Sequence, residues 1–421
     1  MKKLLSLLLA LAMFAGLALP AMAEEPVTIE FWYSFENQMV EQIMTVIAAF
    51  EEANPGIKVK PTYAGSYNES NQKLLAAHAA NAVPAVQQTV QTSIATFAEN
   101  GVLAPIDQYI AANNDDMSVY AKGMYEAYSY NGQQYGVPAF CSVCPTMYYN
   151  KTFATNEGIE IPKTWEEFDA FLRKATVKDE NGNTTRYGCS FAGWGSAYFG
   201  PIFWENGVEA FEDEEMTKTG LGSEKAVNVI KMLKGWVDEG LVKWCYGTNA
   251  STNMRQSLID GTSFAVFHTC AVYSVYQPAL ANNGYEVGVA FPPSGEKTIA
   301  DLGGSGLTIM AKATEAQKEA AYKFIRWLTQ PEGNLVVIKA TGYMPVTTEC
   351  LESEGCKEWV VANPELKNLY DHMDDVYAAP ASPVYLTWLW LIDPLADLGH
   401  GDEVPVAALG IALLDNGAVA V

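Results

Sequence analysis

The chain has 421 residues, and its 49 aspartates and glutamates outnumber its 26 lysines and arginines, which gives a formal net charge of −23. A chain this acidic is a poor partner for nucleic acid or for an anionic membrane surface. Its length is sufficient for two domains, each with a substantial core.

The amino terminus has the pattern of a cleavable export signal. Lys2 and Lys3 precede an apolar run over residues 4–19, and Pro20-Ala21-Met22-Ala23 supplies the small residues of a cleavage site. The run is short for a membrane-spanning helix, so a retained anchor is the weaker reading. No cysteine near the cleavage site offers a point for lipid attachment. We therefore expect residues 1–23 to be removed and the rest to be a periplasmic or secreted protein.

Strands and helices alternate in the first part of the mature chain. We expect a strand over 27–33, and then a helix that Asn54-Pro55-Gly56 ends. That helix has apolar residues at helical spacing: Met39, Val40, Ile43, Met44, Ile47 and Phe50. A second strand runs from Ile57 to Tyr63, although Pro61 weakens this assignment.

The alternation continues through the rest of the chain, which favours an α/β fold built on doubly wound, mostly parallel sheets. A second lobe begins near the capping box Thr164-Trp165-Glu166-Glu167, and Ser223 is a plausible N-cap of a helix that ends at Gly240. Pro292-Pro293-Ser294-Gly295 continues neither helix nor strand, which makes it the best candidate for a crossing between lobes. The other expected helices are 67–81, 94–100 and 314–328, and the other strands are 85–90, 146–150, 263–269, 285–291 and 307–310.

Seven cysteines follow the signal, and an odd number leaves at least one unpaired within the chain. Cys141 and Cys144 have the spacing of a redox or zinc motif. They lie in an expected strand, however, where residues three apart point to opposite faces. We therefore expect no redox or zinc site there. Cys350 and Cys356 are candidates for a disulfide across a loop.

The common signatures of hydrolases and cofactor enzymes are absent from the sequence. The four histidines are far apart, and neither Gly-x-Ser-x-Gly nor His-Glu-x-x-His occurs. Adjacent acidic pairs such as Asp115-Asp116 suggest the two carboxylates of a glycosidase, but solvated surfaces explain them better in so acidic a chain. The run Gly303-Gly304-Ser305-Gly306 precedes an expected strand and lacks lysine, so it is no nucleotide-binding loop. It still allows a ligand to approach the backbone. We expect neither a metal nor a cofactor.

Aromatic residues beside glycine, asparagine or serine are the positive signal for a binding site. Flat rings stack on the C–H faces of a sugar, while amides and hydroxyls bind its hydroxyl groups. About half of such residues are expected to be ordinary core aromatics instead. The candidates are Tyr63, Tyr67, Tyr148, Tyr149, Trp194, Tyr198, Trp204, Tyr343 and Trp388.

Seven short motifs, in order along the chain, resemble those of extracellular solute-binding protein family 1 of ABC transporters. This group includes the maltose-type and glycerol-3-phosphate-binding proteins. The motifs are Phe31-Trp32-Tyr33-Ser34, Phe50-Glu51-Glu52-Ala53-Asn54-Pro55, Pro61-Thr62-Tyr63-Ala64-Gly65-Ser66-Tyr67, Met147-Tyr148-Tyr149-Asn150-Lys151, Pro162-Lys163-Thr164-Trp165, Leu302-Gly303-Gly304-Ser305 and Thr341-Gly342-Tyr343-Met344-Pro345.

The resemblance implies a two-lobed periplasmic-binding-protein fold of type II, with a three-segment hinge and the ligand between the lobes. We expect residues 24–137 plus 295–341 to form the N-terminal lobe, and residues 138–294 plus 342–421 the C-terminal lobe. Closure about the hinge would present the loaded protein, acting as a monomer, to the membrane subunits of an ABC permease.

The resemblance also implies ligand contacts at Tyr67, Trp194, Gly304 and Tyr343, with Trp194 as the main stacking surface. Gln91 stands where the family member has an acidic contact, and Ser142 lies beside Val143 at a serine contact. A serine contact near Thr269 and Cys270 is missing, and residues 379–390 lack the family's arginine.

A phosphate in a closed cleft needs a compensating charge, so an uncharged sugar, oligosaccharide or polyol suits these residues better than a phosphorylated solute. Two alternatives stay open. A secreted carbohydrate-active enzyme requires two carboxylates at a fixed separation in the cleft, and a solute sensor presents the same closed form to a membrane receptor.

Overall fold

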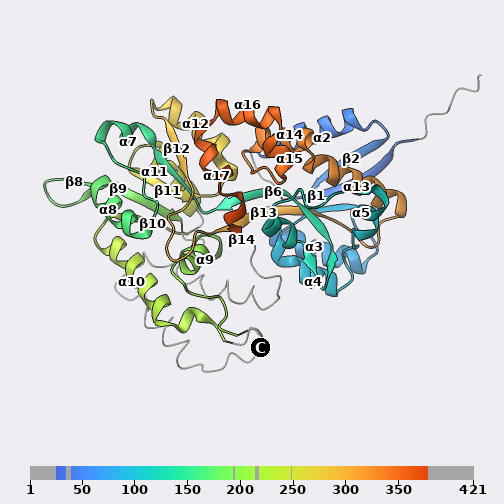
Figure 1. Ribbon diagram of the computed structural model, residues 1–421, viewed down its shortest axis with the longest axis horizontal. Coiled ribbons are helices and arrows are strands. Elements are labelled where there is room, and N and C mark those ends of the chain that lie inside the picture. Colours follow the sequence, from blue (N-terminus) through green and yellow to red (C-terminus); the bar gives the residue numbers. More distant parts are fainter. Residues whose placement is uncertain (1–24, 35–38, 193–194, 214–217, 248, 378–421) are drawn as a thin grey trace, which may run out of the picture.

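The computed structural model describes residues 25–34, 39–192, 195–213, 218–247 and 249–377. The expected signal at 1–23 and Trp388 lie outside these ranges. The described chain forms two six-stranded sheets, each with helices packed against it, and one two-stranded hairpin (Figure 1). No helix in the described ranges is both long enough and apolar enough to cross a bilayer.

The first sheet has the strand order β14-β13-β3-β1-β2, and β6 pairs with β13 outside that path. Strand β1 is parallel to β2 and β3, whereas β13 is antiparallel to β3 and β6. Because β2 is an edge strand, Pro61 is tolerated within it. The strands are β1 (Val27–Tyr33), β2 (Ile57–Tyr63), β3 (Val86–Thr89), β6 (Gly136–Cys144), β13 (Ala300–Ile309) and β14 (Val376–Tyr377).

The helix that follows β1 packs on this sheet through Ile43, Val46 and Phe50. The Phe50 ring meets Phe324 edge to face at 4.9 Å between centroids. Met44, which was expected on the buried face, is instead 36% exposed, because the buried stripe runs through Val46 at the i+3 position from Ile43. The helices in this half are α2 (Met39–Ala53), α3 (Tyr67–Ala79), α4 (Ile94–Glu99), α5 (Asp107–Asn113), α6 (Lys122–Glu126), α13 (Glu315–Thr329), α14 (Pro331–Thr341), α15 (Thr348–Glu352) and α16 (Glu354–Ala362). Helix α17 (Lys367–Tyr370) packs instead against β12 (Val287–Ala290) of the second sheet.

The second sheet has the strand order β10-β9-β11-β7-β12, with the short β8 paired to β9. Strand β9 is parallel to β10 and β11, while β7 is antiparallel to β11 and β12. Both sheets are therefore mixed, with parallel pairs beside antiparallel ones. The strands are β7 (Thr146–Asn150), β8 (Val177–Lys178), β9 (Thr184–Ala192), β10 (Val242–Cys245), β11 (Ser263–His268) and β12 (Val287–Ala290), and β4 (Ser129–Tyr130) and β5 (Gln133–Gln134) form a separate hairpin.

Two helix starts predicted for this half are confirmed by their caps. The Thr164 hydroxyl accepts a hydrogen bond from the Glu167 amide, and Ser223 caps the Ala226 amide in the same way. The helices are α7 (Lys151–Glu157), α8 (Trp165–Ala175), α9 (Gly195–Glu205), α10 (Glu224–Asp238), α11 (Ala250–Ile259) and α12 (Tyr273–Asn282).

The chain passes between the two sheets at Pro145, which separates β6 from β7, and again between β12 and β13. Residues 292–295 lie in the second passage. Strand β6 stays in the first sheet as far as Cys144, beyond the expected boundary at 137/138. The glycine run at 303–306 lies inside β13, not before a strand, because this strand begins seven residues earlier than predicted.

Candidate functional site

Five predicted ligand residues gather where the carboxyl ends of β3 and β6 meet the first half of β13. Gly303 pairs with Ser142 and Gly304 with Cys141 across the β6–β13 ladder. We call β13, which follows the passage from the second sheet back to the first, the hinge strand. The group is called the hinge-strand cluster, and it consists of Tyr67, Gln88, Gln91, Ser142, Gly304, Ser305 and Tyr343. Gln88 and Ser305 are its two members that the sequence did not identify. Ligands of α/β proteins bind at the carboxyl ends of strands, which is where this cluster lies.

Gly304 is a position where only glycine fits. Its φ is +83°, and a Cβ atom built there would lie 1.9 Å from the Phe140 carbonyl oxygen and 3.1 Å from Cε1 of Tyr343. Both the left-handed backbone and the close approach exclude other residues. The glycine run thus brings the hinge strand against the Tyr343 ring.

Tyr343 is placed by the end of α14. Gly342 closes that helix with a φ of +84°, and the Met344 amide then donates to the Cys141 carbonyl of β6 at 2.8 Å. The Tyr343 ring meets Phe140 edge to face at 5.9 Å. Burial raises the pKa of the Tyr343 hydroxyl well above its ordinary value, so this phenol stays neutral.

Tyr67 is the first residue of α3, and a capping box fixes that helix end. The Ser66 hydroxyl accepts the Glu69 amide, while the Glu69 carboxylate accepts the Ser66 amide. The Gln88 side-chain nitrogen donates to the Tyr67 hydroxyl at 3.2 Å. Burial raises the pKa of Tyr67 to about 12, so its phenol is also neutral.

Gln91 and Ser142 contribute polar groups from two further segments. The Gln91 side-chain nitrogen donates to the Leu302 carbonyl of β13 at 2.7 Å, which leaves the amide oxygen as an acceptor. The side chains of Gln91 and Ser142 are both buried. An acidic residue at position 91 would be unable to donate to Leu302, so glutamine here ties the site to the hinge strand.

Trp194, the sixth predicted contact, lies outside the described residues. It follows β9 by two residues, and Ala192 at the end of β9 pairs with Cys245 at the end of β10. The neighbouring strand β11 ends at His268, whose imidazole is within 3.2 Å of the Ser251 hydroxyl. Burial and the nearby Arg255 lower the pKa of His268 to about 3, so its ring stays neutral.

Comparison with known proteins identifies the family. A model described as bacterial extracellular solute-binding protein matches residues 45–368. The chain belongs to this family. Among curated relatives, the sn-glycerol-3-phosphate-binding periplasmic protein UgpB of Salmonella typhimurium is 26% identical over 369 residues, which cover 82% of this chain and 80% of the relative.

Solved structures show that this solute-binding protein has the two-lobed fold of its family. UgpB from Mycobacterium tuberculosis in complex with glycerophosphocholine is similar with a TM-score of 0.77 at 22% identity, over 92% of this chain and 96% of that one. The maltose/maltodextrin-binding domain MalE from Bdellovibrio bacteriovorus bound to maltotriose has a TM-score of 0.73 at 22% identity, over 93% and 99%. The recognition of the family and the two-lobed α/β prediction are thereby confirmed.

The predicted aromatic candidates of this solute-binding protein divide into three groups. Tyr148 and Trp204 are core residues, and the Tyr148 hydroxyl donates to the Cys270 carbonyl at 3.0 Å. Tyr63 is 47% exposed at the end of edge strand β2, and Tyr149 is half-buried. Tyr67 and Tyr343 lie in the hinge-strand cluster. The side chains of Trp194, Tyr198 and Trp388 are outside the described part.

The cysteines are buried and stand apart from other metal-ligating side chains in the described chain. All seven are buried thiols, and no group of three metal-ligating side chains occurs in the described ranges. Burial raises the pKa of the Cys141 thiol, which suppresses the thiolate. The Cys350 thiol hydrogen-bonds that of Cys356, and the disulfide between them stays a prediction.

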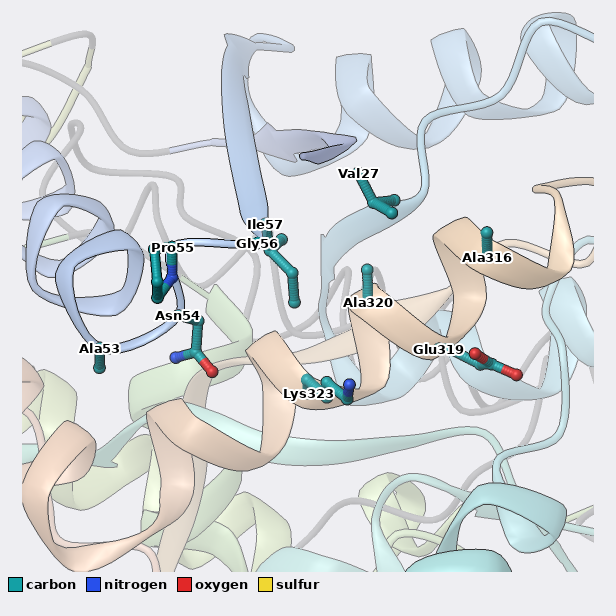
Figure 2. Close-up of a pocket in the computed structure, with 10 residues that line it drawn as sticks. All are labelled: Val27, Ala53, Asn54, Pro55, Gly56, Ile57, Ala316, Glu319, Ala320 and Lys323. Atoms are coloured by element: carbon teal, nitrogen blue, oxygen red, sulfur yellow. The ribbon is translucent and has the colours of Figure 1, made fainter. Parts of the chain in front are cut away.

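A separate hollow of about 390 Å³ lies on the first half of the molecule, between the turn after α2 and helix α13 (Figure 2). Figure 2 shows Ile57 and Ala320 facing each other there, with Val27 above them. Val27 and Ile57 begin β1 and β2, so this hollow is at the amino ends of the parallel strands. The hinge-strand cluster is at their opposite ends, and the hollow is therefore not part of the candidate site.

Proposed function

We propose that this protein captures an uncharged polyhydroxy solute (a sugar, an oligosaccharide or a polyol) outside the cytoplasm and delivers it to the permease of an ABC importer. The hinge-strand cluster carries this proposal. Its members offer phenol and alcohol hydroxyls, amide oxygens, a bare glycine backbone and two aromatic rings, which together match the hydroxyl groups and C–H faces of such a solute.

The named solutes of the relatives support this class. A glycerol phosphate, a glycerophosphocholine and a maltotriose share several hydroxyl groups on a short carbon frame. No member of the hinge-strand cluster is cationic, and residues 379–390 contain no arginine. A dianionic phosphate would therefore lack a compensating charge at this cluster, which favours the uncharged members of the class.

The proposed mechanism is closure of two lobes around the solute, with the chain acting as a monomer. We place the lobe boundaries at the passages between the two sheets, near Pro145 and within residues 291–299, and the third near Tyr343. A cleaved signal at 1–23 would deliver the chain to the periplasm or the medium. A sensor would use the same closed form, and the presence of genes for two permease subunits beside this one distinguishes an importer from a sensor.

The protein is proposed to perform no reaction on its ligand. Burial raises the pKa of Asp301 in β13 and of Glu205 at the end of α9 well above ordinary carboxyl values. Burial thus favours the neutral form of both groups, whereas a glycosidase needs one ionised carboxylate beside its acid. Incubation with maltotriose followed by chromatography tests this, because the solute should be recovered intact.

The decisive experiment is a thermal-shift panel followed by titration calorimetry. Glycerol, maltose and maltotriose are compared with glycerol 3-phosphate and glycerophosphocholine. An uncharged member should raise the melting temperature most, because a ligand that binds only the native state stabilises it. A shift confined to the phosphorylated solutes would contradict the uncharged class, and no shift with any solute would contradict the function.

Trp194 is tested with the same panel. Trp194→Ala should weaken binding of the best solute by about 5- to 30-fold, because stacking on a sugar face contributes roughly 1–2 kcal/mol. Trp359→Ala on α16 is the control, since that tryptophan lies away from the hinge-strand cluster. Equal affinities of Trp194→Ala and the unmodified protein would remove Trp194 from the site.

A further inference from the structure

Gln88 holds three segments of the chain together from a buried position beside the candidate site. Its side chain is 1% exposed. The side-chain nitrogen donates to the Tyr67 hydroxyl at 3.2 Å and to the Ser305 hydroxyl at 2.8 Å, and the side-chain oxygen accepts the Ser34 amide at 2.9 Å. One amide thus joins the start of α3, the hinge strand β13 and the end of β1.

The orientation of this amide is determined by its partners. The Ser34 amide can only donate, so the Gln88 oxygen must face it, and the nitrogen with its two hydrogens must face the two hydroxyls. Both hydrogens are then used. A flipped amide would place its nitrogen against the Ser34 amide and lose that hydrogen bond.

This orientation determines the direction of the hydrogen bonds at Tyr67. Both hydroxyls accept from Gln88, so each keeps its own proton. Because the phenol oxygen already accepts the Gln88 amide, the phenol's own proton is directed away from Gln88, and no described residue accepts it. Tyr67 then presents a donor to a solute oxygen.

We propose that Gln88 is a positioning residue for solute binding, which acts through Tyr67 by holding its hydroxyl as a hydrogen-bond donor and coupling it to the hinge strand. This inference rests on the proposed function, because it assumes that Tyr67 contacts the solute. It also narrows the chemistry of the solute. The solute atom at Tyr67 is an oxygen that accepts a hydrogen bond, whereas the amide oxygen of Gln91 accepts one from a solute hydroxyl. A neighbouring pair of hydroxyl groups satisfies both.

A double-mutant cycle by calorimetry tests the proposal, with maltotriose and glycerophosphocholine as the two probes. Gln88→Met should weaken binding about 5- to 10-fold, which is the effect of one misdirected hydrogen bond. Tyr67→Phe should weaken it by a similar factor. In the Tyr67→Phe background, Gln88→Met should cost less than about twofold, because the donor that Gln88 orients is already gone.

Two further variants separate positioning from folding. Gln88→Glu keeps the shape and the Ser34 contact, but its carboxylate accepts the two hydroxyl protons and turns them inward, so affinity should fall although the fold is kept. Gln87→Met is the matched control. Gln87 is the preceding residue of β3 and fully buried, but neither of its amide atoms has a partner among the described residues, so its affinity should be unchanged.

The outcomes separate this inference from the proposed function. If Gln88→Met lowers the affinity equally in the presence and absence of the Tyr67 hydroxyl, the positioning role is overturned and the proposed function is unaffected. If neither probe binds, the inference is tested by NMR. The protein is then labelled at the tyrosine ring carbon that bears the hydroxyl. The Tyr67 resonance, assigned from Tyr67→Phe, should move in Gln88→Glu and stay in Gln87→Met. An unmoved resonance in Gln88→Glu would overturn the inference.

Discussion

Two regions of this protein, one polar and one aromatic, are filled by different kinds of side chain. Beside the first sheet, buried amides and hydroxyls on β3 and β13 hydrogen-bond to one another, as the Thr89 and Thr308 hydroxyls do at 2.7 Å. Behind the second sheet, rings pack on rings, and Phe168 lies 5.3–5.7 Å from the rings of Trp236, Phe267 and other aromatic neighbours. Hydrogen bonds are directional and ring packing is much less so. The polar region therefore sets orientation at the site, and the aromatic region chiefly supplies stability.

The largest expected effect is on the free energy of unfolding, for a substitution in the aromatic core. Phe168→Ala should lower the free energy of unfolding by about 3–5 kcal/mol, since it leaves a cavity among several rings. Below the unfolding transition its affinity for the best solute should stay within about twofold. Denaturant titration with calorimetry measures both. Val361→Ala at an 81% exposed position is the control and should change stability by less than about 0.5 kcal/mol. A large loss of affinity in the folded Phe168→Ala variant would contradict the view that the aromatic region acts on stability and not on solute binding.

A substitution in the hinge strand should lower both the free energy of unfolding and the affinity for the solute. Gly304→Ala forces a left-handed residue to carry a Cβ atom 1.9 Å from a carbonyl oxygen. Gly182→Ala in the β8–β9 turn is a matched control, because it has the same φ of +83° with nothing within 4 Å. Gly304→Ala should be about 2 kcal/mol more destabilising than its control and should also weaken solute binding. Equal effects of the two variants would mean that the close approach at Gly304 is unimportant.

The smallest predicted effect is a dependence of the free energy of unfolding on pH. It tests the core behind the second sheet. Glu205 is buried, and its carboxyl accepts the Trp165 ring N–H at 2.9 Å while the other oxygen has no described partner. Burial raises the pKa of Glu205 well above the ordinary 4.5, so the folded state holds the proton more tightly than the unfolded state. The resulting stability is fully present below pH 4.5 and is lost as pH rises toward the folded-state pKa.

Glu205→Gln keeps an acceptor for Trp165 and removes this proton. The unmodified protein should lose stability with rising pH by up to about 1.4 kcal/mol per unit, and the variant should lose less. Unfolding curves at several pH values, starting near pH 4.5, compare them. Parallel pH profiles of the two proteins would show that Glu205 does not titrate in this way.

Local patterns in the sequence were sufficient for much of the fold. Strand 27–33, the caps at Thr164 and Ser223 and the turn at Asn54-Pro55-Gly56 were all predicted, because each depends on neighbours within a few residues. The same patterns failed where packing decided the outcome. Met44 and Val46 are both apolar on one helix, and only the position of the sheet selects which is buried.

The candidate site shows the same limit. Tyr67, Gly304 and Tyr343 were identified through motifs, and five of the six predicted contacts lie together in the structure. Gln88 and Ser305 were missed, since no local signal separates a buried glutamine that orients a tyrosine from any other glutamine in a strand. Tyr148 was proposed for the site and is a core residue, because its ring packs against Tyr276 at 4.5 Å.

By itself the sequence determined the export pattern, the alternation of strands and helices and the family, because each is written in contiguous residues. Only the tertiary structure decided that β13 passes through the glycine run beside β6, and that one amide joins Ser34, Tyr67 and Ser305. The contact between Gln88 and Ser305 bridges residues 217 positions apart. Hydrogen-bond direction between such distant groups depends on where the folded backbone places them, and no pattern of neighbours specifies that.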